Sequence, residues 1–271
     1  MAQQFKGTAL ITGASSGIGS IYAERLAQRG YDLVLVARNR DRLNTLASRI
    51  TRETQQNVEV FQADLAAAQG LAEVERKLRE DASITLLVNN AGIGTHTRLL
   101  DSDVERMAQM IDLNVTAVTR LTYAAVPGFI ARRQGAVINI SSIVSLAPEL
   151  LNGVYGASKA YVTAFTHSLH KELAEQGIRI QAVLPGATAT DFWATGGLPV
   201  ENLDPGIVMS ASDLVDGALQ DFDNGVAISI PSMHDLAQYQ RYEASRQALS
   251  SQLSSNQLAP RYHANSPIEG V

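Results

Sequence analysis

The sequence predicts an α/β fold in which helices flank a doubly wound parallel sheet, and three observations support this prediction. Short apolar runs of strand length alternate along the chain with longer segments of helical periodicity. A glycine-rich turn joins the first apolar run directly to the first helical segment. The chain has 271 residues, of which 45% are hydrophobic, and this suits one large domain with a full core.

Composition excludes several classes of protein. The net charge of −5 argues against nucleic-acid binding, which requires a basic face. No run of eighteen apolar residues predicts a membrane span, and the first residues lack the pattern of a signal peptide. The chain has no cysteine, which excludes disulfides and thiolate metal sites. We therefore expect a cytoplasmic protein.

The first strand is predicted at Thr8–Thr12 and the first helix at Ile21–Gln28, which Gly30 ends. Between them lies Gly13-Ala-Ser-Ser-Gly17-Ile-Gly19. Glycines let the backbone approach a pyrophosphate, and the following helix N-terminus presents free N–H groups. The spacing is Gly-x-x-x-Gly-x-Gly, so a simple tight connection is the alternative interpretation.

The second strand, Asp32–Ala37, is followed by arginines instead of an acidic residue. An acidic residue at this point favours NAD, because it binds the adenosine ribose, whereas the guanidinium of Arg38 matches a 2′-phosphate. The sequence thus favours NADP(H) over NAD(H). The alternative is that Arg38 or Arg40 only caps the next helix in solvent.

The chain continues as alternating helices and strands. Asp64, after the third strand, either contacts an adenine or caps the next helix, and spacing favours the cap. Asn89-Asn90-Ala91-Gly92 ends the fourth strand and suits either a ligand crevice or a polar turn. Asn114 is expected in mid-helix, where an amide is mildly unfavourable, and most such residues face water. Helices are expected at 41–56, 101–125, 211–223 and 234–253, and a further helix follows Asp64 and ends at about 81. The later strands are expected at 58–61, 84–88, 135–142, 178–184 and 226–230.

Tyr155 and Lys159 are four residues apart, so on a helix they share one face. The ammonium group is expected to lower the pKa of the phenol below its free value of about 10, which suits a general acid/base. Ser142 ends the fifth strand upstream. An ordinary exposed pair on a surface helix is the alternative.

The segment 187–210, called the flap below, is rich in glycine and proline and contains the single tryptophan, Trp193. It is expected to be a mobile cover over a site, with a plain surface loop as the alternative. Phe192 and Trp193, together with Leu146, Leu150 and Leu151, indicate an apolar substrate.

Over about residues 6–231 the chain resembles the short-chain dehydrogenase/reductase family. The matching motifs, in order, are Thr12-Gly-x-x-x-Gly-x-Gly19, Asn89-Asn-Ala-Gly92, Asn114, Ser142, Tyr155-x-x-x-Lys159 and Pro185-Gly-x-Thr188. The resemblance implies a single-domain Rossmann-like sheet of about seven parallel strands over residues 1–231. The polar, Gln/Ser-rich composition after it predicts an extension, 232–271, that is partly helical and ends loosely. It also implies an oxidoreductase that uses NAD(P) on carbonyl/alcohol pairs.

The resemblance assigns roles by position. Tyr155 would exchange the proton, Lys159 would hold the nicotinamide ribose, Ser142 would hold the substrate oxygen, and Asn114 would hold a water that links Lys159 to solvent. Some members that use NADP carry a basic residue where this chain has Ser16. The cofactor site would comprise Tyr155 and Lys159 together with Gly13, Ser15, Ser16, Gly17, Ile18, Gly19, Arg38, Asp64, Leu65, Asn90, Ala91, Gly92, Pro185, Gly186 and Thr188.

The leading hypothesis is an NADP(H)-dependent enzyme that reduces an apolar ketone. One alternative is a 3-oxoacyl thioester reductase, which would need a cationic patch that the sequence does not place near the flap. Another is a regulator that binds NADPH without turnover. No metal is expected, since His167 and His170 are interpreted as a solvated face. His96 either contacts the substrate or lies in a surface loop, and the loop is favoured. The family resemblance also implies a homodimer or homotetramer, packed through the helices at about 101–125 and 155–175.

Overall fold

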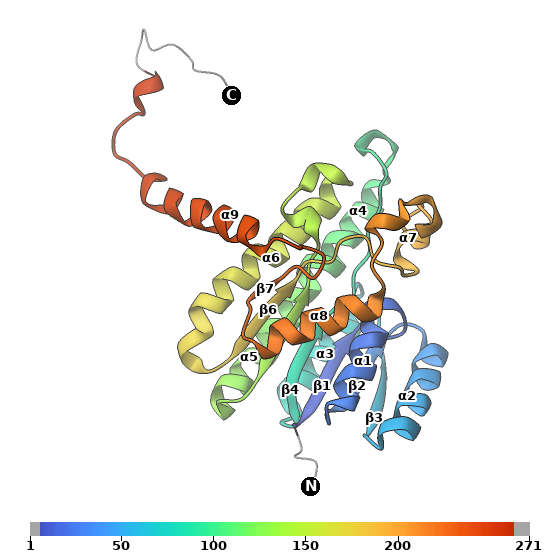
Figure 1. Ribbon diagram of the computed structural model, residues 1–271. Coiled ribbons are helices and arrows are strands. Elements are labelled where there is room, and N and C mark those ends of the chain that lie inside the picture. The colour runs from blue at the N-terminus through green and yellow to red at the C-terminus, as the bar shows by residue number, and fades with distance from the viewer. Residues whose placement is uncertain (1–5, 263–271) are drawn as a thin grey trace. The chain divides into compact units, whose positions relative to one another are not determined.

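The computed structural model describes residues 6–262 and divides the chain into two compact units, Met1–Ser232 and Met233–Val271. The first unit is built on one sheet of seven parallel strands in the order β3-β2-β1-β4-β5-β6-β7 (Figure 1). This confirms the predicted Rossmann-like doubly wound fold. The strands are β1 (Thr8–Thr12), β2 (Asp32–Ala37), β3 (Val58–Gln62), β4 (Ile84–Asn89), β5 (Ala136–Ile140), β6 (Arg179–Val183) and β7 (Ile228–Ser229).

Helices cover both faces of this sheet (Figure 1). One face is covered by α1 (Gly17–Gln28), α2 (Arg40–Thr54) and α8 (Ala211–Asp223). The other is covered by α3 (Ala68–Glu80), α5 (Val118–Arg132) and α6 (Gly153–Leu173). Because the central strands are buried on both sides, they appear in the sequence as continuous apolar runs, and all five residues of β1 are buried.

The segment predicted as one helix over 101–125 consists of three elements. α4 (Val104–Ile111) leads into a π-helical turn (Asp112–Ala117), and α5 follows and continues to Arg132. The prediction of a single regular helix is therefore wrong. The π-helical turn holds Asn114, and such wide turns are frequent at functional sites.

Two further element boundaries differ from the prediction near the site. β5 ends at Ile140, two residues before the predicted end at Ser142, which begins a 3₁₀ turn (Ile143–Ser145). α1 begins at Gly17 instead of Ile21, so Gly17 and Gly19 belong to its first turn.

The second unit contains α9 (Leu236–Leu249), shorter at both ends than the helix predicted over 234–253. The prediction of a loose end falls largely on residues 263–271, which lie outside the described residues. In the described chain, no helix combines the length and the apolar character that crossing a bilayer requires.

Candidate active site

The predicted site residues gather where the carboxyl ends of four neighbouring strands, β1, β4, β5 and β6, meet at one edge of the sheet. The glycine turn follows β1, Ala91 and Gly92 follow β4, Ser142 follows β5, and Pro185 and Gly186 follow β6. A backbone hydrogen bond from Ile143 N to Pro185 O (3.0 Å) ties the last two turns together. Motifs that are far apart in the sequence thus form one site.

The glycine turn forms a cradle for an anion. Gly13 (φ +65°) and Gly17 (φ +54°) adopt left-handed conformations that residues with a side chain rarely adopt. A Cβ atom at Gly19 would lie 2.4 Å from the backbone oxygen of Gly13. The Ser16 side chain makes no capping hydrogen bond, and the first turn of α1 has no acidic residue. The N–H groups at this helix N-terminus therefore remain available to a pyrophosphate.

Asn90 holds the glycine turn in shape from the neighbouring strand. Its Nδ2 donates to the carbonyl oxygens of Thr12 (2.9 Å) and Gly13 (3.2 Å). In return, the hydroxyl oxygen of Thr12 accepts from the backbone N–H groups of Asn90 (2.9 Å) and Ala91 (3.0 Å). Both hydrogens of the Asn90 amide are used in this way, so its Oδ1 is the atom left for the cofactor contact that the family resemblance implies.

Arg38 follows β2 and is exposed, so its guanidinium is accessible to a ligand. The cap of α2 is Asn39, whose side chain accepts from Arg42 N (2.9 Å). The alternative in which Arg38 or Arg40 serves as this cap is therefore wrong.

The predicted cap at Asp64 is also wrong, because the N-cap position of α3 is Ala67. The Asp64 carboxylate instead accepts from Ala66 N (3.0 Å) and shapes the turn before the helix. Leu65, which follows it, is buried.

Tyr155 and Lys159 lie one turn apart on α6, and each is only 6% exposed. This excludes the alternative of an exposed surface pair. The Nζ atom of Lys159 lies 5.9 Å from the centroid of the Tyr155 ring and donates to the carbonyl of Ile140 (2.8 Å). The Ser142 hydroxyl, also buried, donates to Pro185 O (3.4 Å), and it lies near enough to the Tyr155 phenol to lower the pKa of that group. The structure therefore brings Ser142, Tyr155 and Lys159 together.

The predicted direction of the Tyr155 pKa is wrong. Burial raises the pKa of Tyr155 to about 12, and the Ser142 hydroxyl offsets only part of this rise. The prediction relied on the charge of Lys159, but burial also lowers the pKa of Lys159 to about 8. The phenol therefore stays protonated at neutral pH, the form required of a proton donor.

Asn114 is 1% exposed and does not face water. Its amide clamps the segment after β4: Nδ2 donates to Ile93 O (2.9 Å), and Oδ1 accepts from Ile93 N (3.0 Å). A Cβ atom at Gly92 would lie 3.1 Å from Asn114 Oδ1 and 3.5 Å from Lys159 Nζ. Only glycine therefore leaves open the space between this amide and the ammonium group.

The flap reaches the Tyr155 side chain through its short helix α7 (Phe192–Thr195). The ring centroids of Phe192 and Tyr155 are 5.7 Å apart. Trp193 anchors the same helix, because its indole N–H donates to Thr188 O (2.9 Å). Thr188 is itself buried and donates to Gly186 O (3.1 Å), so the base of the flap is fixed to the turn after β6.

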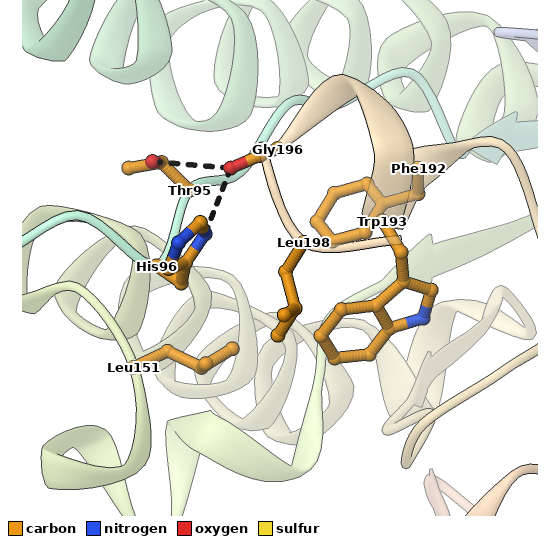
Figure 2. Close-up of a pocket in the computed structure, with 7 residues that line it drawn as sticks. All are labelled: Thr95, His96, Leu151, Phe192, Trp193, Gly196 and Leu198. Atoms are coloured by element: carbon orange, nitrogen blue, oxygen red, sulfur yellow. Dashed lines mark hydrogen bonds between the residues drawn. The ribbon is translucent and has the colours of Figure 1, made fainter. Parts of the chain in front are cut away.

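A small apolar hollow lies beneath the flap (Figure 2). In Figure 2 the side chains of Leu151, Leu198 and Trp193 converge on one space. The ring N–H of His96 donates to Gly196 O (3.0 Å), which ties the segment after β4 to the flap. The residues that line the hollow are Thr95, His96, Leu151, Phe192, Trp193, Gly196 and Leu198.

Sequence reasoning found only part of this lining. It identified Leu151 and the two aromatic residues, but it set His96 aside and did not identify Thr95, Gly196 or Leu198. The one available signal was the position of His96, four residues after Gly92. Leu150, predicted beside Leu151, is 59% exposed.

Across residues 6–262, the His, Asp and Glu side chains form no group of three that is able to hold a metal ion. His167 and His170 lie on α6.

The comparisons with known proteins agree with this geometry. A family model described as short chain dehydrogenase matches residues 7–197. A very-long-chain 3-oxoacyl-CoA reductase from Anas platyrhynchos is 35% identical over 186 residues, which span 67% of this chain and 60% of the relative.

Two solved structures are similar over nearly the whole chain. A short-chain dehydrogenase from Sphingobium yanoikuyae in complex with NADPH has 46% sequence identity and a TM-score of 0.92, and the match covers 94% of this chain and 99% of that one. A bulky-bulky ketone specific alcohol dehydrogenase from Comamonas testosteroni has 42% identity and a TM-score of 0.88, with coverage of 95% and 98%.

Proposed function

Because this chain belongs to the short-chain dehydrogenase/reductase family, we propose that it is an NADP(H)-dependent oxidoreductase that reduces large apolar ketones to secondary alcohols. The observation that carries this proposal is the position of the Tyr155 phenol. It is buried, close to the Ser142 hydroxyl and covered by the apolar ring of Phe192 from the flap.

The residues present fit a nicotinamide dinucleotide. The glycine cradle, with its uncapped helix N-terminus, suits the pyrophosphate. Arg38 suits a 2′-phosphate, and the structure of the Sphingobium yanoikuyae relative contains NADPH. When bound, the reduced nicotinamide supplies the hydride to the carbonyl carbon.

The side chains of the chain supply position and the proton. Ser142 would donate a hydrogen bond to the substrate carbonyl oxygen and orient it toward Tyr155. Tyr155 would then transfer its phenolic proton to this oxygen as negative charge develops there. Lys159 would hold the cofactor ribose and favour the phenolate that remains, since opposite charges lower the pKa of a phenol.

The lining of the hollow beneath the flap supports an apolar substituent on the ketone. Leu151, Leu198 and the rings of Phe192 and Trp193 supply most of this lining. The Comamonas testosteroni structure belongs to an enzyme described as specific for bulky-bulky ketones, and the match covers 95% of this chain.

A 3-oxoacyl thioester remains the second candidate substrate. The relative from Anas platyrhynchos is named for such a reaction. The sequence predicts no cationic patch near the flap, but the structure places two arginines against the flap. Arg106 donates to Thr195 O (3.0 Å), and Arg42 pairs with Asp191.

The test is consumption of NADPH at 340 nm with three groups of substrates: diaryl ketones, small methyl ketones and 3-oxoacyl thioesters. Preference for diaryl ketones supports the proposal, whereas preference for thioesters supports the second candidate. A binding titration with NADPH runs alongside. Binding without turnover of any carbonyl compound would identify a cofactor-binding regulator instead.

We also propose that the enzyme is a cytoplasmic homo-oligomer that assembles through α5 and α6. Tyr123, 69% exposed, and the half-buried Phe165 stack their rings at 6.4 Å on this face. The Tyr161 ring also stacks with the Phe165 ring, at 5.7 Å. Exposed aromatic groups of this kind favour an interface. Light scattering of the purified protein, with Tyr123→Glu as the disrupting variant, tests this proposal.

A further inference from the structure

An ion pair connects the arginine-rich start of α2 with the flap. Arg42 Nη1 lies 3.4 Å from Asp191 Oδ2, and both side chains are more than half exposed. Asp191 is the residue at which α7 begins, directly before Phe192 and Trp193. The guanidinium of Arg42 is therefore tied to the helix that covers Tyr155.

The base of the flap also adjoins the glycine cradle. A Cβ atom at Gly17 would lie 3.1 Å from the methyl group of Thr190, the neighbour of Asp191. Arg42 belongs to the same turn as Arg38 and Arg40, since Asn39 caps α2 by accepting from Arg42 N. The Asp191 carboxylate therefore contacts the first turn of α2, close in sequence to Arg38, and its neighbour Thr190 adjoins the glycine cradle.

This ion pair is weak and easily exchanged. An exposed pair of this kind changes the equilibrium between its paired and separated states by no more than about fivefold. A phosphate monoester carries nearly two negative charges, and a guanidinium can bind two of its oxygens at once. A 2′-phosphate is therefore the stronger partner for Arg42.

We propose that Arg42 is a binding residue for the 2′-phosphate of NADP(H), and that Asp191 occupies its guanidinium until the phosphate replaces it. This inference rests on the proposed NADP(H)-dependent function. The exchange frees Asp191, so the start of α7 loses one of its tethers when the phosphate binds. Recognition of NADP(H) over NAD(H) is in this way linked to the position of the flap, and by reciprocity the flap position changes the affinity for the phosphate.

Trp193 provides a readout that does not depend on activity. It is the single tryptophan of the chain and lies two residues after Asp191, with its indole N–H on Thr188 O. Its emission therefore reports the position of α7. Adenosine 2′,5′-bisphosphate and ADP serve as ligands, because they lack the nicotinamide and differ in the 2′-phosphate. Calorimetry at fixed ionic strength gives the dissociation constants of the full chain for both.

We expect the bisphosphate to change Trp193 emission and ADP to change it far less. Arg42→Gln should weaken binding of the bisphosphate about tenfold, as expected for the loss of one charge-assisted contact, and leave ADP binding unchanged. Asp191→Asn should show the altered emission without ligand and bind the bisphosphate up to about fivefold more tightly. The matched control is Arg52→Gln, an exposed arginine in the last turn of the same helix, which should behave as wild type.

Three outcomes would overturn the inference. Equal emission changes with the two ligands, or unaltered bisphosphate binding by Arg42→Gln, would overturn it while the proposed function stands. Failure of the wild-type protein to bind either nucleotide would overturn the proposed function together with the inference.

Discussion

The aromatic ring of Phe192 lies against the ring of Tyr155, with their centroids 5.7 Å apart and their planes at 44°. Phe192 belongs to the flap and Tyr155 to α6, so this contact joins the flap to the side chain that we propose as the proton donor. Phe192 also contributes to the burial that raises the pKa of Tyr155 to about 12. The position of the flap and the protonation of the phenol are therefore linked.

Gly94→Ala should disturb this contact. A Cβ atom at Gly94 would lie 2.3 Å from Phe192 Cζ and 3.1 Å from Tyr155 Cε2, so the Phe192 ring must move. We expect overpacking to lower the free energy of unfolding by about 1–3 kcal/mol and to change the emission of Trp193. Urea unfolding followed by circular dichroism measures the first effect.

The double variant Gly94→Ala with Phe192→Ala tests the cause. If the two side chains collide, the loss caused by Gly94→Ala should largely disappear once the Phe192 ring is gone, with a coupling of about 1 kcal/mol or more. Additive losses would show that the alanine acts elsewhere.

Tyr155→Phe should leave the fold and the binding of NADPH intact but lower turnover of a ketone about 10²- to 10⁴-fold, because the phenolic proton is lost. The measurements are steady-state rates at 340 nm and a fluorescence titration with NADPH. Tyr123→Phe is the matched control, since Tyr123 is 69% exposed on α5 and should keep full activity. Undiminished turnover by Tyr155→Phe would refute the role proposed for Tyr155.

Lys159→Met should change how stability depends on pH. Burial lowers the pKa of Lys159 from 10.5 to about 8. Between these two pKa values the unfolded chain binds more protons than the folded chain, so the free energy of unfolding rises with pH. The destabilisation caused by burying the charged Lys159 is fully present below pH 8 and is relieved as the pH rises through this range. Relative to Lys159→Met, the wild-type protein should gain up to about 2 kcal/mol between pH 8 and about 9.5.

Urea unfolding of both proteins across this pH range gives the difference. Lys171→Met is the control, because Lys171 is exposed on the same helix and its removal should produce no such pH dependence. A difference between wild type and Lys159→Met that stays constant from pH 7 to about 9.5 would contradict a pKa near 8.

Glu75→Gln should destabilise the contact between α3 and α5. Glu75 is 5% exposed and forms ion pairs with Arg120 of α5 and with Arg79 (2.6 Å). The hydrogen bond from Arg120 is the main cause that lowers the pKa of Glu75. We expect a loss of about 1–3 kcal/mol at pH 7, toward the lower end because both arginines are half exposed.

The effect of Glu75→Gln should depend on pH. Because the folded pKa is lowered, the stabilisation by Glu75 is present above the unfolded value of 4.5 and is lost as the pH falls through the folded value. Thermal unfolding at neutral and acidic pH should therefore show the variant and the wild type converging in acid. Glu80→Gln, an exposed position on α3, should have little effect at either pH.

The sheet was predictable from the sequence because its central strands are buried on both faces. Runs such as Leu33–Val36 are apolar without interruption, which indicates a covered parallel strand. The site motifs that directly follow a strand, such as Ala91 and Gly92 after β4, were predictable because the strand ends of a parallel sheet meet at one edge.

The π-helical turn around Asn114 was not predictable in this way, since one extra residue per turn hardly alters the apolar spacing over a short segment. The pKa of Tyr155 was predicted in the wrong direction because sequence spacing shows a neighbouring charge but not burial. Thr95 and Gly196 were missed because they are far apart in the sequence and come into contact only when the chain folds.

The brace that Asn90 places on the glycine turn has a consequence for the assembly of the nucleotide site. The glycines belong to the first strand–helix unit, whereas the amide that fixes them follows β4. A fragment that stops before β4 would retain every glycine of the turn but would lack the Asn90 amide that holds the turn in its conformation. Moving this nucleotide site to another protein would therefore require both the glycine turn and the segment after β4. Folding of the amino-terminal strands alone would not complete the site.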